Sequence, residues 1–279
     1  MNKFIAAFDG LKMSVSNVDY AIAMAKDSTS FLTGVFLDDR TYTSYKIYDL
    51  VMEQGVSEKK LKQYEHDDFE HRRRSSAIFT EKCEASGMYF NIHHDKNVAL
   101  QELLHETVYS DLLIIAAGEN FTHHEEKFPS RFIRDLLSDT QCPIMLTPQW
   151  FQPFTKVFFL FDGEPTSVYA MKMFTYLFPN YKELEVEVLT VKPMETTGHV
   201  PDNKLVKEWM KRHFRNAEFT VLKGIPSEEI IKYLKEEKQH SCVVLGAYRR
   251  TMVSRWFKSS LADKLASELD WPVFIAHNK

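Results

Sequence analysis

A basic loop near the end of the chain has the residue types that bind phosphate. In the stretch LGAYRRTMVSRWFKSSLAD, residues 245–263, Gly246 ends an apolar run and two adjacent serines, Ser259 and Ser260, precede a helical pattern. The segment between them is rich in cations, including Arg249 and Lys258. Free N–H groups at a helix N-terminus bind anions, and basic side chains add charge-assisted hydrogen bonds. The loop is therefore a candidate phosphate site; alternatively, its cations face solvent and its apolar residues pack on a neighbouring surface.

Two aspartates occupy matching places in the two halves of the chain. Asp9 and Asp162 each lie in a Phe-Asp-Gly sequence at the end of an apolar run, and a serine follows five residues later, Ser14 or Ser167. An aspartate at the carboxyl end of a parallel strand can accept hydrogen bonds from a ribose. It can equally satisfy backbone donors at the turn, and for the serines we expect helix capping.

The second half of the sequence repeats the pattern of the first half, which indicates two similar units. FIAAFDGLKMSVSNVDYAIAMAK is echoed by VFFLFDGEPTSVYAMKMFTYLF, and DLLIIAAGEN by SCVVLGAYRR. In the second half, apolar runs alternate with helical patterns. This alternation predicts α/β units with five-stranded parallel sheets, flavodoxin-like or Rossmann-like, flanked by helices. The expected strands are 156–162, 184–191, 217–222, 241–246 and 272–276, and the expected helices are 166–178, 202–214, 226–238 and 259–269.

A proline-containing segment, TPQWFQPF, predicts the boundary between a first domain at 1–149 and a second at 154–279. The first domain has an insertion near 40–86, in which a tyrosine-rich loop precedes a long amphipathic helix from about Ser57 to Glu84. Because the second domain lacks this insertion, we expect the helix to contact a partner protein rather than to stabilise the fold. We also expect the two domains to pair through their last strands, because pairing removes exposed sheet edges.

Composition excludes several classes of protein. The net charge of -4 and the 44% hydrophobic content fit a globular protein, and they give no support to binding of nucleic acid or of a membrane surface. No apolar run is long enough to span a bilayer and no signal peptide is evident, so a cytoplasmic protein is expected. The three cysteines have no metal-ligand spacing and are expected to be reduced. The run THHEE is expected to be a solvated loop rather than a metal site.

The repeated plan resembles the universal stress protein family in its tandem form, over nearly the whole chain. The resemblance rests on Asp-Gly-x-x-x-Ser after the first strand of each half, and on a glycine and paired serines before the last helix and strand of the second. It implies an adenine nucleotide alpha hydrolase-like fold. In ATP-binding members the fourth strand is followed by Gly-2x-Gly-9x-Gly-Ser/Thr, which holds the phosphates.

The match to this phosphate motif differs between the halves. The second half has Gly246, then Arg249 where a glycine belongs, then Ser259 and Ser260 at the last two positions. The first half keeps Gly118 but has Phe121 at the second glycine and is one residue short before Ser130. By resemblance, the nucleotide contacts are therefore Asp162, Gly246 and Ser260 in the second domain, and Asp9 and Gly118 in the first. The further candidates are Ser259, at the position of the third glycine, and Arg249 and Lys258, whose charges offset part of the loss of the glycines.

The resemblance implies a regulatory binding protein of the stress response, with ATP or a related nucleotide in the second domain and no metal beyond nucleotide-bound Mg. No nucleophile–base pair is recognisable, so we expect no enzyme, or at most slow ATP hydrolysis. The alternative is a scaffold that binds no nucleotide and docks a partner protein through the inserted helix.

Overall fold

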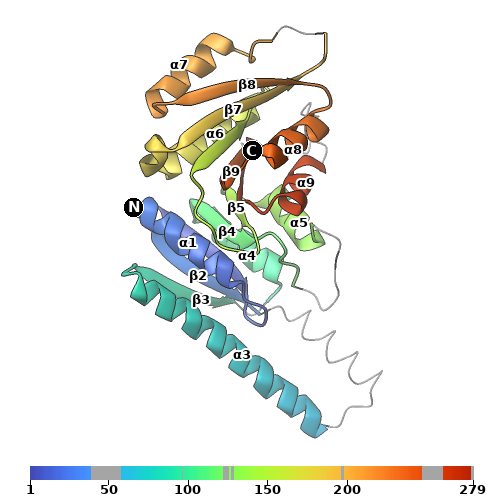
Figure 1. Ribbon diagram of the computed structural model, residues 1–279. Coiled ribbons are helices and arrows are strands. Elements are labelled where there is room, and N and C mark those ends of the chain that lie inside the picture. The colour runs from blue at the N-terminus through green and yellow to red at the C-terminus, as the bar shows by residue number, and fades with distance from the viewer. Residues whose placement is uncertain are drawn as a thin grey trace. The chain divides into compact units, whose positions relative to one another are not determined.

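The computed structural model describes residues 1–38, 58–95, 97–121, 126, 129–195, 198–246 and 260–277 (Figure 1). Contacts divide the chain into two compact units, Met1–Gln141, called unit 1, and Cys142–Lys279, called unit 2. This division falls one strand before the boundary expected from the prolines, so the strand at Ile144–Thr147 is grouped with unit 2. The domain boundary itself stays a prediction.

Unit 1 is a parallel α/β structure. Its strands lie in the order β3-β2-β1-β4, and each neighbouring pair is parallel. Helices connect the strands, as the sequence pattern predicts. The elements are β1 (Lys3–Asp9), α1 (Val15–Asp27), β2 (Phe31–Leu37), α3 (Glu58–Ala85), β3 (Phe90–Asp95), α4 (Ala99–Val108), β4 (Leu112–Ala116) and α5 (Arg131–Asp139).

Unit 2 repeats this plan. Its strands lie in the order β5-β10-β9-β6-β7-β8; all pairs are parallel except β5 with β10, which are antiparallel. The expected strands and helices of this half are confirmed to within two residues at each end. The elements are β5 (Ile144–Thr147), β6 (Lys156–Leu160), α6 (Pro165–Leu177), a 3-10 turn η1 (Pro179–Glu183), β7 (Glu185–Lys192), α7 (Asn203–His213), β8 (Ala217–Lys223), α8 (Pro226–Glu236), β9 (Ser241–Gly246), α9 (Ser260–Glu268) and β10 (Val273–Ala276).

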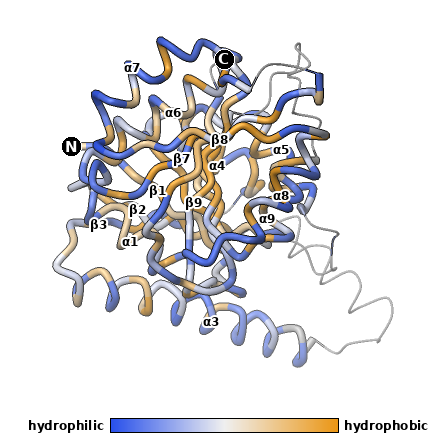
Figure 2. Tube along the Cα trace, turned by 45° about the horizontal axis from the view of Figure 1, so that its top comes forward, coloured by the Kyte–Doolittle hydropathy of each residue, from blue (hydrophilic) through white to orange (hydrophobic). Residues whose placement is uncertain are grey.

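The central strands are buried along nearly their whole length because helices cover both faces of the sheet in each unit. β9 is buried at every residue, and β1 at all but its first. Figure 2 shows these strands in hydrophobic colours, whereas most of α3 is hydrophilic. The three cysteines are buried, and no disulfide bond joins any of them within the described residues.

The long inserted helix is confirmed as α3, but the expectation that it does not stabilise the fold is wrong for its second half. Phe79 and Cys83 of α3 are fully buried. The Phe79 ring lies 5.6 Å from the ring of Phe8, and a side chain on Gly34 would clash with it at 2.8 Å. α3 is the crossover between β2 and β3, so its second half belongs to the core of unit 1.

The two serines after the strand-end aspartates differ in role. Ser14 is the N-cap of α1, and its hydroxyl accepts a hydrogen bond from the N–H of Asn17 at 3.2 Å, as predicted. Ser167 is not the cap of α6, because that position is held by Glu164. The Ser167 hydroxyl instead donates to the Glu164 carbonyl at 2.8 Å.

Candidate functional site

The candidate site of unit 2 lies at the carboxyl ends of β6 and β9, which are neighbouring parallel strands. Asp162 follows β6 and is partly exposed, and its Oδ1 accepts a hydrogen bond from the N–H of Glu164 at 3.0 Å. The intervening Gly163 has φ +87, a left-handed conformation that favours glycine. The turn therefore fixes one carboxylate oxygen of Asp162 and presents the group at the edge of the sheet where α/β proteins bind ligands.

Gly246 ends β9 directly against the start of α6. A Cβ at this position would lie 2.4 Å from the carbonyl carbon and oxygen of Thr166 and 2.7 Å from the nitrogen of Ser167, closer than real contacts allow. Packing alone therefore requires this glycine. The close approach also brings the carboxyl end of β9 next to the turn that carries Asp162.

Three of the predicted contacts in unit 2 lie outside the described residues, namely Arg249, Lys258 and Ser259. Ser260 is described as the first residue of α9. The structure therefore places the Asp162 carboxylate, Gly246 and the start of α9 in one unit, and the assignment of the phosphate contacts stays a prediction.

The corresponding edge of unit 1 contains two buried carboxylates. Asp9 is buried, and its Oδ1 accepts a hydrogen bond from the N–H of Leu11 at 2.8 Å; burial raises its pKa. Glu119, which follows Gly118 after β4, is also buried, and its Oε1 accepts from the N–H of Asn120 at 3.2 Å. Burial, with a further contribution from the charge of Asp9, raises the pKa of Glu119 to about 7. A polyphosphate would meet an acidic environment here.

The N-terminus of α5, where unit 1 would hold phosphate, is already bound by protein groups. Ser130 caps the helix by accepting from the N–H of Ile133 at 3.2 Å, and it donates to the Glu119 carbonyl at 2.6 Å. The Glu126 carboxylate accepts from the N–H of Arg131 at 2.7 Å. A carboxylate of the chain thus occupies the end of the helix dipole that attracts anions.

Phe121 stands where the phosphate motif has its second glycine, and it keeps a left-handed backbone with φ 50. Such a conformation costs a non-glycine residue about 1–3 kcal/mol. Its buried ring packs on Phe132, the second residue of α5, with ring centroids 4.6 Å apart. Bulky aromatic side chains therefore fill the space beside the first turn of α5.

Helix α3 covers the carboxyl end of β1 in unit 1. The Ser75 hydroxyl donates to the Gly10 carbonyl at 2.7 Å, and Arg72 forms an ion pair of 2.8 Å with Asp38 after β2. A Cβ on Gly10 would lie 2.9 Å from the Arg72 side chain. Thus Asp9, which matches Asp162 in sequence, is buried beneath groups that come from a distant segment.

The sequence already indicates that the ends of the fourth strands differ in charge between the two halves. The segment GENFTHHEEK, residues 118–127, places carboxylates after the strand-end glycine of the first half, where the second half has arginines. The individual roles of Glu119 and Glu126, however, are evident only in the structure. Most of THHEE lies outside the described residues; within the described ranges no cluster of three or more metal-ligating side chains is found.

None of the helices that the structure describes is long and apolar enough to cross a membrane. Localisation beyond this finding stays a prediction.

Comparisons with known proteins bear on the fold. No protein-family model matches the sequence, and no curated protein is similar to it at the level of sequence. Among solved structures, a universal stress protein from Archaeoglobus fulgidus DSM 4304 matches with a TM-score of 0.71 at 13% identity, over 100% of this chain and 99% of that one. A functionally unknown protein from Pseudomonas aeruginosa PAO1 matches with a TM-score of 0.60 at 12% identity, over 99% and 92% of the two chains. A candidate universal stress protein from Pseudomonas aeruginosa UCBPP-PA14 matches with a TM-score of 0.58 at 12% identity, over 99% and 93%. The resemblance deduced from the repeated motifs is thus confirmed in the fold, and the chain has the fold of universal stress proteins along its whole length.

Proposed function

We propose that this protein is a regulatory binding protein of the universal stress type, and that unit 2 binds ATP or a related nucleotide. Asp162 contacts the ribose, while Gly246, the start of α9 and the cations Arg249 and Lys258 contact the phosphates. The single observation that carries the proposal is the contrast between two aspartates of matching sequence. Asp162 is partly exposed at the carboxyl edge of its sheet, whereas Asp9 is buried under α3.

The arrangement of the turn supports a binding role for Asp162. One of its oxygens is held by the N–H of Glu164, which orients the carboxylate without neutralising it. A ribose hydroxyl donates hydrogen bonds, and a charged acceptor strengthens such a bond. Because the α6 and β9 backbones meet beside this turn, a ligand on Asp162 lies near Gly246 at the end of β9.

Unit 1 fits a nucleotide poorly, and the proposal therefore assigns it none. Its two buried carboxylates would repel phosphate, Glu126 occupies the first N–H group of α5, and Phe121 and Phe132 fill the space beside the helix. We infer that unit 1 is the structural half, and that Asp9 and Gly118 make no ligand contact.

The test is calorimetric titration of the full chain with ATP and Mg²⁺. We compare the wild type with Asp162→Asn and, as the matched control, Asp9→Asn. Loss of a charge-assisted hydrogen bond worth about 1.5–3 kcal/mol predicts that Asp162→Asn weakens binding roughly tenfold or more. Asp9→Asn should leave the affinity unchanged.

Circular dichroism of each variant checks that it folds. Equal weakening by Asp9→Asn would refute the assignment to unit 2. No heat of binding to the wild type at millimolar ATP, together with no nucleotide in the denatured, freshly purified protein by mass spectrometry, would refute nucleotide binding and favour the scaffold alternative.

A further inference from the structure

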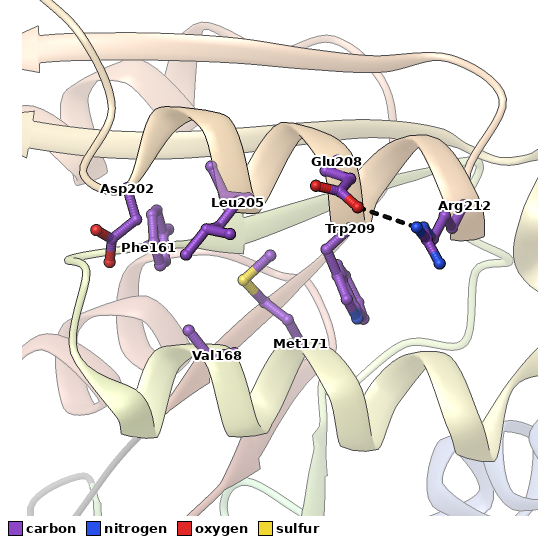
Figure 3. A pocket seen from close by; sticks show the side chains of 9 residues that line it. Phe161, Val168, Met171, Asp202, Leu205, Glu208, Trp209 and Arg212 are labelled. Atoms are coloured by element: carbon purple, nitrogen blue, oxygen red, sulfur yellow. Dashed lines mark hydrogen bonds and ion pairs between the residues drawn. The ribbon is translucent and has the colours of Figure 1, made fainter.

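A cavity of about 440 Å³ lies between α6 and α7 of unit 2. Figure 3 shows Met171 rising from α6 towards Leu205 and Trp209, which descend from α7. The cavity has about three times the volume of the ~150 Å³ cavity that holds benzene in an engineered protein, and it falls in the range of small-molecule sites. Its lining is mostly apolar and consists of Phe161, Val168, Met171, Asp202, Leu205, Val206, Glu208, Trp209 and Arg212.

A comparison with unit 1 indicates that the cavity of unit 2 fits an aromatic ligand. α3 buries Phe79 and Cys83, four residues apart, on its sheet-facing side, and α7 buries Val206 and Met210 with the same spacing. In unit 1 the Phe79 ring covers Phe8, the residue before Asp9, at 5.6 Å between centroids. In unit 2 the residue before Asp162 is Phe161, and it lines the cavity together with the smaller Val206. In unit 1 an aromatic ring of the chain thus covers the phenylalanine before the strand-end aspartate, whereas in unit 2 the corresponding phenylalanine, Phe161, lines a cavity.

The charged residues at the rim of the cavity indicate which charge an aromatic ligand should carry. Arg212 and Glu208 pair with each other at 2.9 Å, so they contribute little net charge. Asp202, the N-cap residue of α7, has a left-handed backbone, and its side chain makes no capping hydrogen bond. Within the described part of the chain, the Asp202 carboxylate has no hydrogen bond or ion pair. Among the described lining residues, Asp202 is thus the acidic group without a cationic side-chain partner, and it lies next to Phe161 in Figure 3.

We propose that the cavity between α6 and α7 binds a small aromatic ammonium compound. The ring lies over Phe161 between Met171 and Trp209, and the ammonium group pairs with Asp202. The lining residues include none of the proposed nucleotide contacts, and the proposal does not depend on nucleotide binding.

The test is titration of the full chain with three probes that share one ring: naphthylethylamine, naphthylethanol and naphthylacetate. We expect the amine to bind most tightly and the acetate most weakly. Asp202→Asn should weaken the amine about three- to fivefold, the size expected of an exposed ion pair, and leave the alcohol unchanged. Val206→Phe, which enlarges a side chain of the lining, should abolish binding of all three probes because its ring takes up space in the cavity.

The controls separate this site from other sources of binding. Asp162→Asn should leave amine binding unchanged, which also distinguishes failure of this proposal from failure of nucleotide binding. Binding of the amine that survives Val206→Phe would overturn the location, and equal affinity for the amine and the acetate would overturn the ligand class. Dimerisation of the wild type in sedimentation, abolished by Val206→Phe, would show that a second copy covers the cavity and would also overturn the proposal. If Val206→Phe does not fold, Asp202→Asn decides, since its position is exposed.

Discussion

Replacing Glu119 by glutamine should remove a pH-dependent loss of stability from unit 1. Glu119 is buried beside Asp9, and its pKa is raised from 4.5 to about 7. The folded state therefore keeps a proton that the unfolded chain releases near pH 4.5. The stabilisation is complete below that pH and is lost as the pH rises through 7. A difference of about 2.5 pKa units at about 1.36 kcal/mol each gives a loss of roughly 3 kcal/mol.

Glutamine resembles the protonated carboxyl group in shape and lack of charge. We therefore expect Glu119→Gln to match the wild type near pH 4.5 and to exceed its free energy of unfolding by up to about 3 kcal/mol at pH 8. The raised pKa of Asp9 adds a slope of the same sign. Because the charges of Asp9 and Glu119 interact, the difference between the two curves reports Glu119 together with its coupling to Asp9.

The assay is urea denaturation between pH 4.5 and 8. All four tryptophans, at positions 150, 209, 256 and 271, lie in unit 2. Tryptophan fluorescence consequently follows unit 2, while far-ultraviolet circular dichroism follows both units. Glu126→Gln is the matched control from the same unit, and loss of its contact with the α5 N-terminus should cost at most about 1 kcal/mol. Parallel curves for the wild type and Glu119→Gln over this range would refute the reasoning.

Two further predictions concern unit 2. Lys156 lies 2.9 Å from the buried Glu187 and is only 13% exposed. Lys156→Ala should therefore lower the free energy of unfolding, measured in urea, by about 3–5 kcal/mol. Lys235→Ala, which breaks an exposed pair, should lower it by less than about 1 kcal/mol. Equal effects would contradict this account. Gly246→Ala places a methyl group 2.4 Å from backbone and should destabilise by about 1–3 kcal/mol, whereas Gly118→Ala, with nothing within 4 Å, should be neutral or slightly stabilising in thermal unfolding. A neutral Gly246→Ala would show that the α6 contact yields easily.

Local sequence was sufficient to predict most of the secondary structure. The strands of the second half were located within two residues because short apolar runs between helical patterns have few other interpretations. α3 was recognisable as one long helix because apolar residues recur in this charged segment at roughly helical intervals. The repeat also predicted the universal stress protein fold, which persists at 13% identity because it depends on the pattern of buried positions more than on particular side chains.

The role of α3 was not predictable from the absence of a matching insertion. The first half of α3 has no counterpart in the shorter helix α7 of unit 2. The second half of α3, however, supplies the crossover helix that a pair of parallel strands needs. The sequence hint was the apolar pair Phe79 and Cys83, whose counterparts in α7 are Val206 and Met210. The sequence does not show that Val206 lines a cavity whereas Phe79 is fully buried, because this depends on how each helix packs on its sheet.

The sequence by itself determined that each half has an aspartate at the end of its first strand, followed by a helix. Only the tertiary structure decided that Asp9 is buried and Asp162 is partly exposed. The groups that make the difference, Arg72 of α3 and Glu119 after β4, are 63 and 110 residues from Asp9 in the chain, and both contribute to its electrostatic environment. Local pattern specifies which residues form a strand or a helix. Burial and charge at a strand end, however, depend on segments that the fold brings together from far along the chain.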